Sequence, residues 1–261
     1  MERPRGRRRD WGVYGAIAVF LAVALPVLFL EACGSNGSKA VGASAATSTT
    51  RPPLNVNAFE ANRRDQPLAP AAQARLTADL ATARAVTKEY PTVAAATAAH
   101  LLQAGGFAPL LGAHYISYAN LDREIRPDGS VDPRYPGGFI YDGNDPTSRI
   151  VGLMYISLGD TLPAGFPGPN DRWHQHHNLC IQYGRGPGGS IAVPFAPDRD
   201  ITRAACDGVH GTFMKKTVWM VHAWVVPGFA SPAGVFSHED PNLKCANGTV
   251  KTDAVGFCKG T

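Results

Sequence analysis

The sequence predicts an α+β fold in which two N-terminal helices pack on an antiparallel β-sheet or small barrel, preceded by a membrane-spanning helix and a flexible linker. The 261-residue chain contains 28 Gly and 21 Pro and only 18% charged residues. This composition disfavours a helical bundle or coiled coil and favours short strands joined by turns. The segments expected in chain order are 1–10 (cytoplasmic, basic), 11–32 (membrane anchor), 33–57 (linker) and 58–261 (an extracytoplasmic α+β domain).

The N-terminus has the pattern of a membrane anchor. Residues 11–30 form an apolar run without a charge, directly after an Arg-rich segment. Twenty helical residues span about 30 Å, the thickness of the hydrocarbon core of a bilayer. Because a basic flank stays on the cytoplasmic side, we expect the domain to lie outside the cytoplasm and to be held at the cell membrane.

Two kinds of anchor fit this segment. Residues 30–33, Leu-Glu-Ala-Cys, resemble a bacterial lipobox, in which Cys33 would carry the lipid, but Glu31 stands where a small residue is usual. The apolar run is also longer than that of a typical signal peptide, which favours an uncleaved single-pass helix. Residues 33–57 are rich in Ser, Thr, Ala and Gly and are expected to be a linker.

The formal net charge of +4 gives no indication of a nucleic-acid partner. Half of it comes from residues 1–32, where five Arg stand against three acidic residues. The rest of the chain carries no basic stripe of the kind that contacts phosphates, so nucleic acid is not an expected partner.

Helical periodicity appears twice at the start of the domain. The first helix is expected over residues 70–89, with Pro91 ending it, and the second over residues 92–103, with Gly105 and Gly106 after it. The apolar face of the first helix is formed by Leu76, Leu80, Ala83 and Val86.

Short runs rich in Tyr, Ile, Val and Phe follow the helices and alternate with Gly- and Pro-containing turns. Such runs are typical of strands in an antiparallel sheet. The expected strands are residues 114–118, 138–141, 149–158, 178–183, 190–195, 211–214 and 217–226.

Four cysteines remain in the domain when Cys33 is set aside. An even number in an exported domain indicates two disulfides, for which three connectivities exist. We favour Cys180–Cys206 together with Cys245–Cys258. Metal ligation by Cys180, six residues after a histidine, is the alternative.

The eight histidines are the most informative residues. In an extended segment, the period of two places His174 and His176 on one face and His177 on the other. His222 lies in a strong strand pattern, whereas His114 begins another strand and His238 follows a turn. The hypothesis is a metal site formed by His174, His176 and His222, with His114 or His238 as the fourth ligand or as a supporting residue.

Three imidazoles with an open position are typical of catalytic zinc, and imidazole equally suits copper and iron. Zn, Cu or Fe is therefore the expected cofactor. A binding protein would fill all positions of the ion, whereas an enzyme would keep one open for water or O₂, with Glu239 as the nearest candidate general base. The third interpretation is a structural or interaction domain whose histidines are only buried.

The order of motifs over residues 83–243 resembles a family of exported, His-rich bacterial proteins of unknown function. The motifs are GAHYISYANL, GGFIYDG, RIVGLMYIS, WHQHHNLC, WMVHAWVVPG and GVFSHEDPNL. This resemblance implies a β-rich domain with recurrent histidines at the positions of His114, His174, His176 and His222, and no known reaction. The His-x-His pair with a later His is also loosely similar to cupins, although Cys180 stands near the place of the cupin glutamate.

Overall fold

The computed structural model describes residues 65–186, 189–195, 200–251 and 258. The chain divides into two units, residues 1–49 and 50–261, and all described residues belong to the second. The predicted anchor (11–32), Cys33 and the linker (33–57) lie outside the described residues. Within the described part of the chain, no helix has both the length and the apolar character needed to cross a bilayer.

Both predicted helices are present, and the second is shorter than expected. Helix α1, Pro70–Val86, begins with Pro at its first position and buries the predicted apolar face. Helix α2, Val93–Ala98, begins after Thr92, whose hydroxyl accepts a hydrogen bond from the Ala95 N–H. The prediction that it continues to residue 103 is wrong, because His100 has φ +61°, a left-handed conformation that ends the helix.

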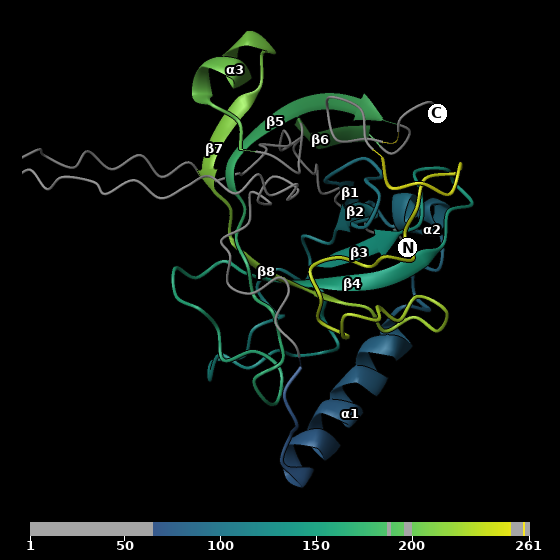
Figure 1. The fold of residues 1–261 in the computed structure, drawn as a ribbon, viewed down its shortest axis with the longest axis vertical. Coiled ribbons are helices and arrows are strands. Elements are labelled where there is room, and N and C mark those ends of the chain that lie inside the picture. The colour runs from purple at the N-terminus through teal and green to yellow at the C-terminus, as the bar shows by residue number, and fades with distance from the viewer. Residues whose placement is uncertain (1–64, 187–188, 196–199, 252–257, 259–261) are drawn as a thin grey trace, which may run out of the picture. The chain divides into compact units, whose positions relative to one another are not determined.

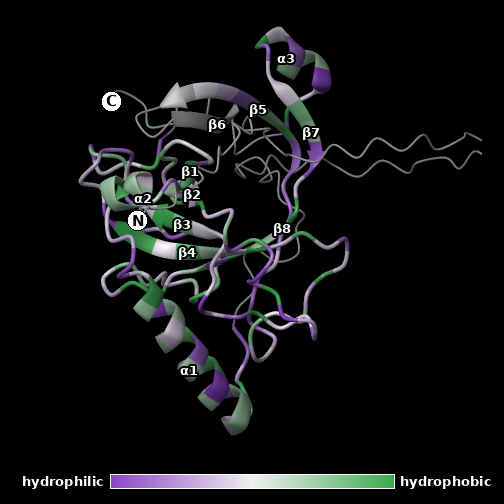
Figure 2. Ribbon diagram, turned by 180° about the vertical axis from the view of Figure 1, so that it is seen from behind, coloured by the Kyte–Doolittle hydropathy of each residue, from purple (hydrophilic) through white to green (hydrophobic). Residues whose placement is uncertain are grey.

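The main sheet is antiparallel with the strand order β1-β2-β3-β4-β8 (Figure 1). Its central strands are mainly hydrophobic (Figure 2), and every residue of β3 and β4 is buried. The strands are β1 (Leu102–Gln103), β2 (Ala113–Ile116), β3 (Gly138–Tyr141), β4 (Ile150–Ser157) and β8 (Trp219–Ala223).

The two faces of this sheet have different roles. Directly paired residues of antiparallel strands point to the same face, so the register separates the faces. On one face, Phe139, Leu153 and Val221 belong to the large core that includes the buried residues of α1. On the other face, His114 pairs with Ile140 and His222 pairs with Met154. The histidines therefore lie on the face opposite to α1.

A second, three-stranded antiparallel sheet has the order β6-β5-β7 and is accompanied by helix α3 (Figure 1). Its elements are β5 (His177–Gly186), β6 (Gly189–Phe195), α3 (Arg203–Gly208) and β7 (Thr212–Lys216). The Cys180–Cys206 disulfide links β5 to α3, and Cys245–Cys258 closes the C-terminal loop. Both favoured pairings are confirmed, so Cys180 is not a metal ligand here.

Candidate metal centre

Five histidines from four segments of the chain gather at one place. His114 comes from β2, His222 from β8, His174 and His176 from the segment before β5, and His238 from the loop after β8. The ring centroids of neighbouring imidazoles lie between 4.5 and 5.6 Å apart, as measured for the pairs 114–222, 174–176, 174–222, 174–238, 176–238 and 222–238.

The segment that carries His174 and His176 lies beside β8. His174 and Met220 exchange both backbone hydrogen bonds, at 2.8 and 2.9 Å. Further along, the Thr217 N–H donates to the His176 carbonyl. Since bridge partners share a face, His174 points to the side that also carries His222. The period of two then places His176 on that side, as predicted, and the contact of the two rings agrees with this placement.

Backbone carbonyls fix the tautomer of two imidazoles. His174 Nδ1 lies 3.0 Å from the Arg172 carbonyl oxygen, and His222 Nδ1 lies 2.8 Å from the His238 carbonyl oxygen. Because a carbonyl oxygen only accepts, each Nδ1 carries the hydrogen and donates it, which leaves Nε2 unprotonated, with a lone pair that can accept a hydrogen bond or bind a metal. Metal-ligating histidines are commonly oriented by such a bond from the second ring nitrogen.

His114 brings a further nitrogen to His222. The two Nε2 atoms are 3.3 Å apart. The contact is a long hydrogen bond, just beyond the range of about 2.7–3.2 Å that is usual for N–H···O bonds. The distance equals the separation of about 3.3 Å expected for two nitrogens that bind one tetrahedral ion at about 2.0–2.1 Å each. The pair is therefore spaced like two ligands of a single ion.

His174, His176 and His238 form a second set. One ligand atom from each of them lies within 4.8 Å of the others. The His174 Nε2 atom and both ring nitrogens of His238 are buried and have no hydrogen-bond partner within the described part of the chain. A buried polar atom without a partner costs about 1–3 kcal/mol, so these nitrogens are suited to a bound ion.

The electrostatics of the cluster favour neutral imidazoles. Burial is the main cause in each case, and it lowers the pKa of His176 to about 3 and of His222 to about 4. Burial, together with repulsion from neighbouring histidines, also holds the pKa values of His114, His174 and His238 well below the usual range. At neutral pH the rings are uncharged, which is the form that binds metals.

The loop after β8 holds His238 in place through its backbone. The Trp224 indole donates from Nε1 to the Ser237 carbonyl at 2.8 Å, and the Trp224 N–H donates to the Val235 carbonyl. On the other side of His238, the Asp240 N–H donates to the Leu110 carbonyl. The loop is thus fixed on both sides of the histidine, which is only 2% exposed.

The structure brings together every histidine that the sequence singled out as a ligand. The period of two places His177 on the opposite face, while His100 and His210 are exposed. Glu239, the candidate base, is partly buried, and its carboxylate is not among the ligand atoms that group here. What the sequence could not identify are the carbonyl acceptors that orient His174 and His222, since any residue type supplies a carbonyl.

Comparison with protein-family models, with curated proteins and with solved structures finds no match.

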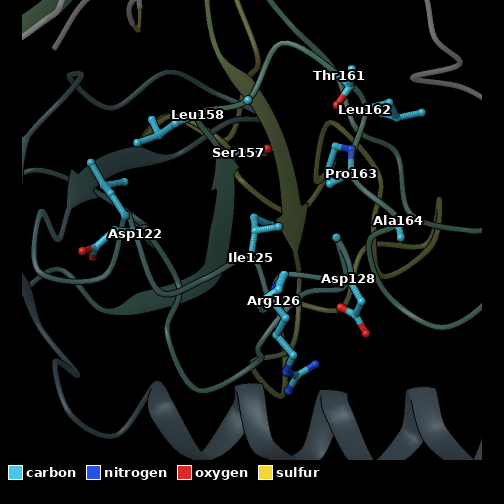
Figure 3. A pocket seen from close by; sticks show the side chains of 14 residues that line it. Asp122, Ile125, Arg126, Asp128, Ser157, Leu158, Thr161, Leu162, Pro163 and Ala164 are labelled. Carbon is cyan, nitrogen blue, oxygen red and sulfur yellow. The ribbon is translucent and has the colours of Figure 1, made fainter.

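An open pocket of about 740 Å³ lies elsewhere in the domain (Figure 3). Its wall comes from two segments, residues 121–129 and 157–164, and includes the charged side chains of Arg126 and Asp128 and apolar groups such as Leu158 and Leu162. None of its lining residues is a histidine or belongs to the cluster. The histidine cluster and this pocket are therefore separate features.

Proposed function

We propose that this chain binds a transition metal ion, Zn, Cu or Fe, through the imidazole cluster, in a domain held at the extracytoplasmic side of the cell membrane. The observation that carries the proposal is the 3.3 Å separation of the His114 and His222 Nε2 atoms, with His222 oriented by a backbone carbonyl. Both features match those of histidines that ligate one ion.

The donor set limits the choice of metal. Imidazole nitrogens suit Zn, Cu and Fe, whereas Mg and Ca prefer oxygen ligands. Cys180, the cysteine nearest to the cluster in sequence, is oxidised in a disulfide and does not offer a thiolate. The ligand atoms that group in the cluster are therefore imidazole nitrogens.

Two observations favour a location of the domain outside the cytoplasm. The basic residues followed by an uncharged apolar run predict an N-terminal anchor with the domain exported. The two disulfides of the domain are typical of an oxidising compartment.

Metal analysis of the full chain, purified without a His tag, tests the proposal. The protein is stripped with a chelator, refilled separately with Zn, Cu and Fe, freed of unbound metal and analysed by mass spectrometry. We expect at least one equivalent of one of these metals per chain. Less than half an equivalent of every metal would refute the proposal.

Two matched variants assign the metal to the cluster. His222→Gln removes a central ligand and is expected to weaken metal affinity at least tenfold. His210→Asn changes an exposed histidine at φ +55°, a conformation that Asn tolerates, and should bind metal like the unchanged chain. Equal affinities of the two variants would mean that the metal is bound elsewhere.

A further inference from the structure

His238 differs from His174 and His222 in the hydrogen bonding of its ring nitrogens. His174 and His222 each use one ring nitrogen on a backbone carbonyl and direct the other into the cluster. In His238, both Nδ1 and Nε2 are buried, and neither has a hydrogen-bond partner in the described part of the chain. His174 and His222 are thus arranged like ligands of one ion each, because Nδ1 of each ring is already bonded to a carbonyl and only Nε2 can bind metal.

A single ion would use only one nitrogen of His238. The other nitrogen, an N–H group, would be buried without an acceptor in the described part of the chain, at a cost of about 1–3 kcal/mol. A histidine that binds an ion through each nitrogen has no such cost. The burial of both nitrogens therefore points to two ligand positions, one on each side of the ring.

The position of His238 fits this role. Its ring centroid lies 4.5 Å from that of His174, 5.5 Å from that of His176 and 5.6 Å from that of His222. Two imidazoles on one tetrahedral ion have centroids about 5.2 Å apart, which lies inside this range. By ring spacing, His238 thus neighbours histidines of both sets, and one of its nitrogens groups with ligand atoms of His174 and His176.

We propose that the cluster holds two metal ions joined by the imidazolate of His238. One ion is bound by His174 and His176, the other by His114 and His222, and each ion takes one nitrogen of the bridging ring. This inference rests on the proposed function, because it requires that the cluster binds metal at all.

Formation of the bridge releases one proton from His238. The neutral imidazole of His238 releases its N–H proton to solvent, and two dative bonds form from the ring nitrogens to the two ions. A strong Lewis acid favours this deprotonation, and Cu²⁺ forms the most stable complexes of the divalent first-row ions. Each ion then has three imidazole nitrogens, and a fourth position can accept water or a small anion.

Copper loading of the full chain tests the bridge. The stripped, untagged protein is incubated with excess Cu²⁺ and freed of unbound ion, and then both bound copper and the electron paramagnetic resonance signal are quantified. We expect two copper ions per chain and a low-temperature signal well below two spins, because an imidazolate couples two Cu²⁺ ions antiferromagnetically. His210→Asn should give the same result.

His238→Gln cannot bridge, so every copper that this variant retains should contribute a full spin. A single copper in the unchanged chain would overturn the bridge and leave the proposed function in place. Two coppers with a full two-spin signal would also overturn it, since the ions would be unlinked. No bound copper, together with no bound Zn or Fe, would refute the proposed function itself. The number of bound copper ions and the number of spins in the unchanged chain test the bridge even if His238→Gln does not fold.

Discussion

Glu124 is a buried carboxyl group away from the histidines, and it makes the stability of the fold depend on pH. Its side chain is fully buried, and Oε2 accepts hydrogen bonds from the Gly137 N–H at 2.7 Å and the Ile156 N–H at 2.8 Å. Oε1 has no partner in the described part of the chain. Burial raises the pKa of Glu124, and the two N–H donors lower it. Burial has the larger effect, so the pKa is about 9. The folded protein therefore keeps this carboxyl protonated at neutral pH.

The sign of the effect follows from proton binding in the two states. In the unfolded chain Glu124 has a pKa of 4.5 and is ionised above pH 5, whereas the folded state retains the proton up to about pH 9. The free energy of unfolding therefore falls as pH rises through this window, by about 1.4 kcal/mol per pH unit. Between pH 6 and 8 the loss is on the order of 3 kcal/mol.

Urea denaturation of the full chain at pH 6, 7 and 8 measures this slope, with a chelator present so that metal binding does not contribute. Glu124→Gln cannot titrate, so we expect the wild type to lose about 3 kcal/mol relative to this variant between pH 6 and 8. Asp122→Asn, which replaces an exposed carboxylate nearby, should keep the wild-type slope. Parallel pH profiles for wild type and Glu124→Gln would show that Glu124 is ionised in the folded protein and would refute the reasoning.

Two further predictions concern the stability of the fold. Replacing both Cys180 and Cys206 by Ala should lower the free energy of unfolding by about 3.5 kcal/mol, the chain-entropy value for a loop of 26 residues; a loss below 1 kcal/mol in urea denaturation would contradict this. Gly112→Ala should cost about 1–3 kcal/mol more than Gly228→Ala. Both glycines have positive φ, but only at Gly112 would the new Cβ lie 2.6 Å from Ile140, so equal midpoints in urea would disprove the clash.

Local sequence patterns predicted most strands, and they failed where a residue takes a conformation unusual for its type or where an element is too short for a periodic pattern. The run at residues 138–141 is β3 with the expected bounds, because apolar residues lie between two turns. The end of α2 could not be predicted, since a histidine, His100, takes the left-handed conformation usually left to Gly. Helix α3 is only six residues long, too short for a periodic pattern, and its Thr202 cap is its main sequence signal.

The site was predictable in composition and not in arrangement. The spacing of His174 and His176 fixes a common face in any extended segment, so this pair followed from the sequence alone. His114 and His222 stand on strands separated by β3 and β4, and no local pattern shows that their Nε2 atoms meet. His238 lies in a loop, where its position depends on tertiary hydrogen bonds and not on periodicity.

The packing of the sheet and the geometry of the histidine cluster depend on the same residues. A Cβ at Gly152 would lie 2.8 Å from the Trp224 ring, so the indole needs a glycine beneath it in β4. In that position Trp224 donates to the Ser237 carbonyl, and the next residue along the chain is His238. The His238 carbonyl in turn accepts the hydrogen bond from His222 Nδ1, which leaves the His222 Nε2 unprotonated and facing His114. A residue without a side chain, buried in the hydrophobic core, thus helps to set the direction of two imidazoles, which explains how a buried sheet can hold a polar cluster in one arrangement.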